Sequence, residues 1–226
     1  MPLKKSVGNM YPWVSHTHSH LGGECPHRCS YCYVDSPRWG RPERYKGPLR
    51  LIESEFNVKY GTGKTIFIEN CNDLFAADVP DSFVRRIMAH CSLWPENTYV
   101  FQTKNPGRYT KGWGFPPKSI IGTTIETNRD IGEISRAPSP TSRALSMLYI
   151  SGVPKFVTIE PVLDFDTDLF AALINGVQPF FVNLGADSKG HNLPEPTVEK
   201  IMQFTEKLKE YGIELREKHN LQRLKP

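Results

Sequence analysis

The chain has 226 residues, of which 38% are hydrophobic and 11% aromatic, enough to bury the core of one moderate domain or two small ones. Its formal net charge of +4 is mild and no run of four lysines or arginines occurs, so the charge indicates an ordinary solvated surface more than a dedicated nucleic-acid-binding face. The first residues are polar and no apolar stretch reaches the roughly 18 residues of a membrane span, which excludes a membrane-spanning protein and predicts a cytoplasmic one with reduced thiols.

Six short runs of apolar, β-branched and aromatic residues predict strands. They span residues 13–17, 65–69, 98–102, 120–125, 155–159 and 180–184. Apolar residues at intervals of three and four predict helices over 81–91, 142–150, 166–174 and 195–211. This alternation is typical of parallel βα units, so we expect an α/β fold whose sheet forms an open sheet or an incomplete barrel. In either arrangement the residues that carry chemistry follow the carboxyl ends of the strands.

Two stretches need separate interpretation. Residues 34–64 fit the alternation least well and predict a basic loop, then a short helix or extended piece near 49–56. The run at 61–65 (GTGKT) resembles a phosphate-binding loop, but it lacks the first glycine of that motif and precedes a strand, so we exclude it.

Three of the five cysteines, Cys25, Cys29 and Cys32, lie within eight residues, soon after the first predicted strand. An odd count and this crowding argue against a disulfide framework and favour a metal site. Three thiolates on one loop can bind three irons of a [4Fe–4S] cluster and leave the fourth iron open to S-adenosylmethionine (AdoMet), whose radical chemistry belongs to the cofactor.

Zinc is the alternative metal. A site of three cysteines and one histidine could recruit a residue from the alternating set His16, His18 and His20. Structural zinc modules usually pair two separated knuckles, and no second knuckle follows here. A zinc-binding structural or nucleic-acid-interaction module therefore stays open as a second function.

The spacing Cys-x₃-Cys-x-aromatic-Cys, with Tyr31 in the aromatic position, resembles the signature of the radical SAM superfamily. The resemblance implies a partial (β/α)₆ TIM barrel with the cluster loop after the first strand. It implies a single radical SAM domain over residues 1–226, with a core of about 12–212 and a polar C-terminal tail. It also implies an enzyme that reductively cleaves AdoMet to a 5′-deoxyadenosyl radical for hydrogen abstraction, supplied with electrons by a donor such as flavodoxin or ferredoxin.

Further segments are similar to a phage-associated, functionally uncharacterised radical SAM family related to spore photoproduct lyase. They are 14–17 (VSHT), 29–33 (CSYCY), 72–75 (NDLF), 78–80 (DVP), 101–104 (FQTK), 121–126 (IGTTIE) and 158–161 (TIEP). Resemblance to the lyase implies that Cys71 delivers a hydrogen atom to the product radical, and that Lys104 and Thr124 contact AdoMet. Tyr31 and Tyr33 match tyrosines that take part in hydrogen return; we assign Tyr33, with Cys71, to catalysis and Tyr31 to the cofactor.

The resemblance leaves the substrate open. Asn72 stands where the lyase has a Thr-Ser pair, and the chain is shorter than the lyase, which uses a C-terminal extension to open its DNA lesion. The substrate classes considered are a nucleic acid or nucleotide and, as an alternative, a small metabolite.

Physical chemistry adds candidates at the strand ends. Lys104 offers a point charge for a carboxylate. Glu126 and Glu160 end apolar strands, where a carboxylate needs a partner, either an amino group or ribose hydroxyls of a ligand or an internal salt bridge.

Small and polar residues complete the candidate set. Asn70 and Asp73 flank Cys71 and could bind the amino group of AdoMet. Ala186 lies in a stretch of small residues after the last predicted strand, where adenine could approach the backbone. Cys91 lies on the predicted helix 81–91 and is expected in the core.

Overall fold

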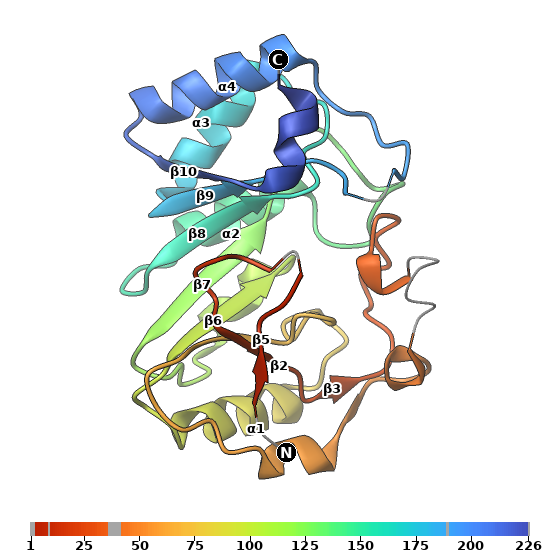
Figure 1. Ribbon diagram of the computed structural model, residues 1–226, viewed down its shortest axis with the longest axis vertical. Coiled ribbons are helices and arrows are strands. Elements are labelled where there is room, and N and C mark those ends of the chain that lie inside the picture. Colours follow the sequence, from red (N-terminus) through yellow and green to blue (C-terminus); the bar gives the residue numbers. More distant parts are fainter. Residues whose placement is uncertain (1–2, 9, 36–41, 189, 226) are drawn as a thin grey trace.

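The computed structural model describes residues 3–8, 10–35, 42–188 and 190–225, and an eight-stranded sheet is its central feature (Figure 1). The strands follow the order β1 (Lys4–Lys5), β2 (His16–His18), β5 (Thr65–Ile68), β6 (Thr98–Thr103), β7 (Ser119–Thr124), β8 (Lys155–Ile159), β9 (Phe181–Leu184) and β10 (Glu214–Glu217). β1 pairs with β2 antiparallel, and every other neighbouring pair is parallel. The expected α/β class with a mostly parallel sheet is therefore confirmed.

Four α-helices occur in the described part of the chain: α1 (Asp81–Ser92), α2 (Pro140–Leu148), α3 (Thr167–Val177) and α4 (Val198–Glu210). In Figure 1, α3 and α4 lie beside the β8–β10 end of the sheet and α1 lies beside the opposite end. Local sequence sets their ends, because Ser139 caps α2 by accepting a hydrogen bond from the Ser142 amide and Thr197 caps α4 in the same way from Lys200.

Irregular segments make the remaining connections. Between β2 and β5 the chain forms a small antiparallel sheet of β3 (Leu21–Gly22) and β4 (Arg50–Leu51) and the 3₁₀ turns η1 (Tyr33–Asp35), η2 (Glu43–Tyr45) and η3 (Glu53–Asn57). A further turn, η4 (Pro106–Lys111), links β6 to β7, and η5 (His219–Leu224) follows β10. Residues 36–41 of the expected basic loop lie outside the described residues.

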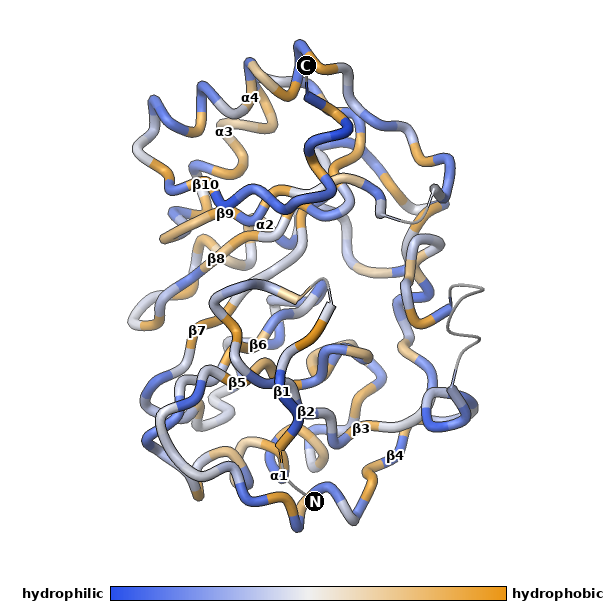
Figure 2. The backbone as a smooth tube through the Cα atoms, viewed as in Figure 1, coloured by the Kyte–Doolittle hydropathy of each residue, from blue (hydrophilic) through white to orange (hydrophobic). Residues whose placement is uncertain are grey.

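Successive residues of the central strands point to opposite faces of the sheet, and these strands are largely buried on both faces. Ile66 and Ile68 of β5 belong to the large core that includes the apolar faces of the helices, whereas Phe67 belongs to a second core on the other face. That second core holds Tyr11 and Trp13 from the segment before β2. In Figure 2 the hydrophobic stretches follow the central strands, and the C-terminal segment is hydrophilic.

Two sequence predictions need correction. The apolar run at 13–17 begins too early, because the amide of Val14 bonds the Tyr11 carbonyl in a turn and the strand starts only at His16. The sheet also has a seventh parallel strand, β10, beyond the six expected units, and an α-helix follows only some of the strands.

The helices of the described residues are too short or too polar to cross a membrane.

Candidate functional site

The loop that carries Cys25, Cys29 and Cys32 follows β3 and is held to the segment after β7. The Ser30 amide donates to the Ile134 carbonyl at 2.9 Å, and the Cys29 Sγ lies 3.1 Å from the Ser135 Oγ. All three cysteines are free thiols of intermediate exposure. The loop is therefore fixed from outside and presents three thiols at the edge of the sheet where the strands end.

Three free thiols on one loop are the donor set that this segment offers to a metal ion or a cluster. Among the described residues, no three His, Cys, Asp or Glu side chains are grouped so that they could hold one metal ion. In a cubane each cysteine binds a different iron, so the thiolates need not converge on one point. Burial raises the pKa of Cys25 to about 12 and also raises that of Cys32, so binding a metal would release protons.

A group of four side chains, two of them fully buried, gathers around the ends of β6 and β7. The Lys104 Nζ lies 2.7 Å from both the Tyr31 hydroxyl and the Glu126 Oε1, and Tyr31 itself donates to Glu126. Arg143, from α2, contacts the other Glu126 oxygen at 2.8 Å. We call Tyr31, Lys104, Glu126 and Arg143 the carboxylate cluster.

The electrostatics of this cluster follow from its burial. Burial alone would raise the pKa of Glu126, but Lys104 and Arg143 hold it well below its usual range. Burial, and then the Glu126 charge, raises the pKa of Tyr31. The cluster is thus a negative charge between two positive ones, with a phenol that keeps its proton.

The sequence indicated Tyr31, Lys104 and Glu126 as separate candidates and did not indicate that they form one cluster. Arg143 was not among the candidates. A charged residue in a helix is usually solvated. However, Arg143 stands in register with Pro140, Ala144 and Met147, which form the buried face of α2. That register is a signal in the sequence that a buried arginine needs a buried acidic partner.

Asp73 joins the cysteine loop to the sheet. Its carboxylate lies 2.8 Å from the His27 Nε2 and accepts from the Thr103 hydroxyl and the Lys104 amide, each at 2.7 Å. Burial would raise the pKa of Asp73, but His27 and these donors lower it. Asp73 thus has several partners within the protein, and its expected contact with AdoMet stays a prediction.

Cys71 and Tyr33, the two residues assigned to catalysis, are in contact. The Tyr33 hydroxyl lies 3.1 Å from the Cys71 Sγ and 2.8 Å from the Asn70 carbonyl oxygen, to which it donates. The Tyr45 hydroxyl also hydrogen-bonds the Cys71 side chain. Sequence reasoning did not single out Tyr45, because it lies in the irregular segment 34–64.

Glu160 and Ala186 meet through Asn220, a residue of η5. The Asn220 side-chain amide donates to the Glu160 Oε1 at 3.0 Å and to the Ala186 carbonyl at 2.8 Å, and the Lys218 Nζ contacts the other Glu160 oxygen at 2.7 Å. A Cβ at Gly185 would lie 2.9 Å from the Asn220 side-chain oxygen and 3.0 Å from the Glu160 Oε1, so the glycine lets both side chains approach the backbone closely.

Thr124 contacts the carboxylate cluster through its backbone only. Its hydroxyl accepts from the Gln102 amide at 2.9 Å, and its backbone carbonyl accepts from Arg143.

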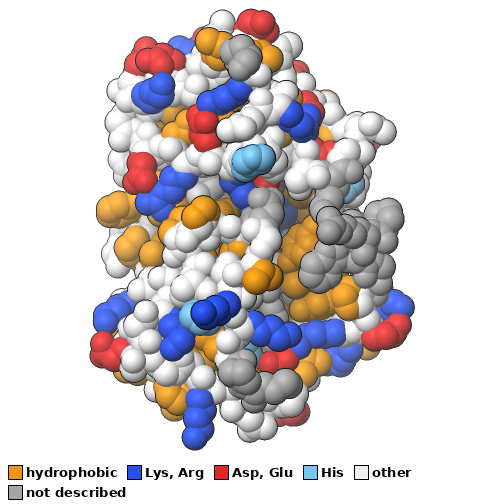
Figure 3. Space-filling view, viewed as in Figure 1, with side chains coloured by type: hydrophobic (Ala, Val, Ile, Leu, Met, Phe, Trp, Pro, Cys, Tyr) orange, Lys and Arg blue, Asp and Glu red, His pale blue; other side chains and the backbone are white. Residues whose placement is uncertain are grey.

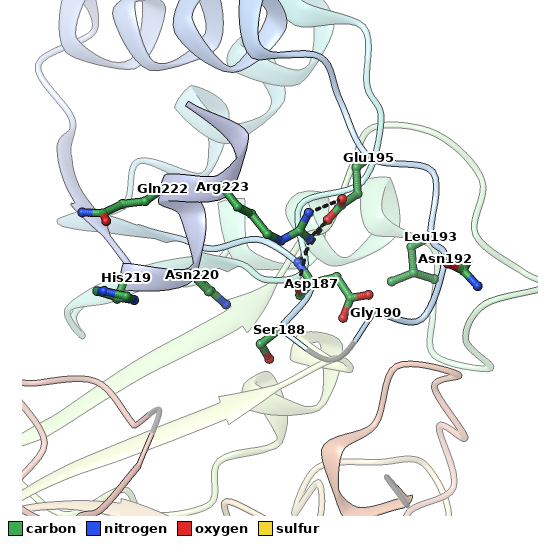
Figure 4. Close-up of a pocket in the computed structure, with 10 residues that line it drawn as sticks. All are labelled: Asp187, Ser188, Gly190, Asn192, Leu193, Glu195, His219, Asn220, Gln222 and Arg223. Carbon is green, nitrogen blue, oxygen red and sulfur yellow. Dashed lines mark hydrogen bonds and ion pairs between the residues drawn. The ribbon is translucent and has the colours of Figure 1, made fainter. Parts of the chain in front are cut away.

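A cavity of about 650 Å³ opens beside Asn220 (Figure 4). It is lined by Asp187, Ser188, Gly190, Asn192, Leu193, Glu195, His219, Asn220, Gln222 and Arg223.

The face drawn in Figure 3 carries side chains of both charges. Lys and Arg lie there with Asp and Glu, and hydrophobic side chains gather toward one side. This agrees with the mild net charge of +4.

Comparisons with known proteins bear on the family and the fold. A family model described as "Protein of unknown function (DUF5131)" matches residues 13–173. No curated protein matches the sequence.

Several solved structures of spore photoproduct lyase are similar to this chain. A mutant with bound AdoMet and dinucleoside spore photoproduct is 11% identical, with a TM-score of 0.55 over 91% of this chain and 65% of that one. The complex with dinucleoside spore photoproduct is 10% identical, with a TM-score of 0.60 over 94% of this chain and 78% of that one. The chain thus spans just under two thirds of the first structure, and at such low identity the likeness establishes the fold alone.

Proposed function

Because the chain belongs to the DUF5131 family, whose function is unknown, and has the fold of spore photoproduct lyase with three cysteines on one loop, we propose that it is a radical SAM enzyme. The observation that carries the proposal is the position of that loop. It lies at the carboxyl edge of a parallel sheet, tied through His27 and Asp73 to the strand end that presents Lys104. This edge is where open α/β sheets bind their ligands.

Cys25, Cys29 and Cys32 would hold a [4Fe–4S] cluster, which when bound supplies the electron that cleaves AdoMet. Lys104 would bind the carboxylate of AdoMet. Its ammonium has three donors, of which the Tyr31 hydroxyl and the Glu126 carboxylate occupy two, and the third would serve AdoMet. At the other end of the edge, Glu160, Asn220 and the backbone of Ala186 offer hydrogen-bonding partners for ribose or adenine.

The contact of Cys71 with Tyr33 supports a role in hydrogen return. The Cys71 thiol would give its hydrogen atom to a carbon radical of the product, which forms a C–H bond and leaves a sulfur radical. Tyr33, 3.1 Å away, would restore the S–H bond with its hydroxyl hydrogen. The phenoxyl radical that remains would return to the phenol either by taking a hydrogen atom from 5′-deoxyadenosine or by gaining one electron from an external donor and one proton.

Anaerobic reconstitution with iron and sulfide tests the proposal. We expect about one [4Fe–4S] cluster per chain and formation of 5′-deoxyadenosine from AdoMet under reduction. Cys29→Ala should lose both, whereas Cys71→Ala, the matched control, should keep both. Stoichiometric zinc without labile sulfide would contradict the proposal and favour the zinc-binding module.

Partners are part of the same proposal. A flavodoxin or ferredoxin would supply the electron, and the substrate would be a nucleic acid, a nucleotide or a small metabolite. Competition separates these classes, since only a nucleic-acid or nucleotide substrate predicts that oligonucleotides change the rate at which AdoMet is consumed.

A further inference from the structure

The buried carboxylate of Glu69 has no part in the chemistry above. Glu69 follows β5 directly and is 2% exposed. Its carboxylate accepts from the backbone amides of His20 and Leu21, the latter at 3.2 Å, and lies 3.1 Å from the His20 Nδ1. The side chain thus joins the end of β5 to the turn that leads from β2 into the cysteine loop.

Titratable and charged groups surround Glu69 from each packed element. On the far side of His20, its Nε2 lies 2.8 Å from the His90 Nδ1 of α1 and 3.2 Å from the Tyr60 hydroxyl. The other groups that act on Glu69 or His20 include His18 of β2, Arg44 and Tyr45 of η2, Glu55 of η3, and Arg86 and Cys91 of α1. Among the described residues these histidines form no metal site.

The backbone at Glu69 is unusual. Its φ is 62°, in the left-handed region that residues other than glycine rarely adopt. Such a conformation persists only where its surroundings impose it, and it is often found next to functional groups. The residues that this turn directs are Asn70 and Cys71, whose carbonyl oxygen and sulfur, respectively, contact the Tyr33 hydroxyl.

We propose that Glu69 is the positioning residue of Cys71: its anchored carboxylate imposes the left-handed turn that holds the Cys71 thiol against Tyr33. The inference rests on the proposed function, in which Cys71 and Tyr33 return hydrogen. Glu69 touches neither sulfur nor phenol and acts only through the backbone of residues 69–71.

The reactivity of the Cys71 thiol reports this contact without a substrate. The hydroxyl hydrogen of Tyr33 is donated to the Asn70 carbonyl at 2.8 Å, so the thiol is the donor in its contact with Tyr33. A sulfur held in that contact is less free to attack iodoacetamide than one without it. Loss of the contact should therefore speed alkylation of Cys71.

The test is a double-mutant cycle on the full chain, with Cys71 alkylation by iodoacetamide followed by peptide mass spectrometry. We expect Tyr33→Phe and Glu69→Ala each to raise the rate about fivefold, the worth of one hydrogen bond. The double variant should react about fivefold faster than the wild type, the same as either single variant. It should not react about twenty-five-fold faster, because both substitutions remove the same contact. A wild-type rate in Glu69→Ala, or rates that multiply, would overturn the inference.

Two conservative variants separate the length of the Glu69 side chain from its charge. They also keep the test decisive if Glu69→Ala does not fold. Glu69→Gln has the same length and can accept from both amides, so Cys71 should react within about twofold of the wild type. Glu69→Asp keeps the charge but is one methylene too short, so Cys71 should react about fivefold faster. The reverse order would overturn the inference. Buried Cys91 should stay unreactive in each folded variant.

These rates do not depend on AdoMet chemistry. Failure of the proposed function would be seen separately, as absence of labile sulfide or of 5′-deoxyadenosine. Failure of the positioning role would be seen in the alkylation cycle alone.

Discussion

Glu126 is a buried charge whose state depends on named partners. Its carboxylate is fully buried between Lys104 and Arg143. Removing one partner of a buried ion pair costs more than the pair contributes, because the remaining charge stays out of water. We therefore expect substitutions of the two cations to have different effects. Arg143 is fully buried and acts on stability, whereas Lys104 keeps a third donor for a ligand.

We expect Arg143→Met to lower the free energy of unfolding by about 3 kcal/mol, since it leaves Glu126 with a single cation and exposes the Thr124 carbonyl to an apolar neighbour. Urea denaturation measures this. Arg129→Met is the matched control. Arg129 pairs with Asp164 and Asp166 at the surface, so its loss should cost less than about 1 kcal/mol. Equal effects would contradict the assigned role.

We expect Lys104→Ala to weaken AdoMet binding by about one to two orders of magnitude, the worth of a charge-assisted hydrogen bond. The iron content should not change, because the cysteine loop is tied to the sheet through the side chain of Asp73 and the backbone of residue 104. Lys111→Ala, which removes an exposed lysine paired with Asp81, should leave the affinity as it was. Binding to the reconstituted protein by calorimetry decides, and an unchanged affinity would remove Lys104 from the site.

At the level of elements, the β7–β8 pair depends on one glycine. A Cβ at Gly122 would lie 2.3 Å from the ring of Phe156, which is fully buried in the core with Tyr11. We expect Gly122→Ala to lower the free energy of unfolding by about 1–3 kcal/mol through overpacking. Gly176→Ala is the control. It lies near the end of α3 with open space around it, so it should raise stability by about 0.5–1 kcal/mol. Thermal denaturation of both variants checks the contrast.

The central strands could be predicted from sequence because they are continuous apolar runs. β8 was predicted to the residue, and β5, β6 and β7 to within one or two. β10 could not be predicted, because its charged residues Glu214, Arg216 and Glu217 give no apolar run, and only its pairing with β9 makes it a strand. Between β2 and β5, the short helix or extended piece expected near 49–56 corresponds to β4 and η3, whereas η2 was not predicted, because tertiary contacts of Arg44 with Glu55 and the Ser19 carbonyl hold it.

The candidate site shows the same division. Tyr31, Lys104 and Glu126 could be selected one by one, because each lies in the cysteine loop or at a strand end, where parallel βα folds place their chemistry. Their meeting in one cluster is set by the tertiary fold, which brings the cysteine loop against the ends of β6 and β7. Asn220 could not be selected, because it lies in the polar segment after β10 and reaches Glu160 only through the path of η5.

For the molecule as a whole, buried histidines set the response to acid. Burial lowers the pKa of His18 to about 4 and that of His20 to about 3, against 6.5 for the ordinary group. At pH 5 both are neutral when folded and protonated when unfolded, so the unfolded chain binds more protons and the free energy of unfolding decreases as the pH is lowered from 7 to 5. Glu69 acts in the opposite direction, because burial raises its pKa to about 7 and the folded chain binds its proton first.

Two histidines outweigh one carboxyl over this interval. We expect the free energy of unfolding to be lower at pH 5 than at pH 7 by on the order of 1–2 kcal/mol. Urea titrations at the two pH values measure the difference. A protein that becomes more stable on acidification would show that these histidines are not neutral in the folded state.

The segment before β2 joins the two ends of the open sheet. The Ser15 amide bonds the Thr65 carbonyl at the start of β5, while the Trp13 ring lies 5.2 Å from that of Phe181 in β9 and 5.8 Å from the Arg216 guanidinium in β10. Tyr11 reaches the middle of the sheet, where its hydroxyl contacts Thr158 at 2.7 Å.

This path has a consequence for the nascent chain. On the ribosome, Tyr11 and Trp13 emerge long before the strands that cover them, and the last of those strands is separated from Trp13 by about two hundred residues of sequence. Contacts of such long range close late, and until they close the aromatic rings are exposed to other partners. Completion of the fold therefore waits for β9 and β10, and a chain released before them would be a client of chaperones and proteases.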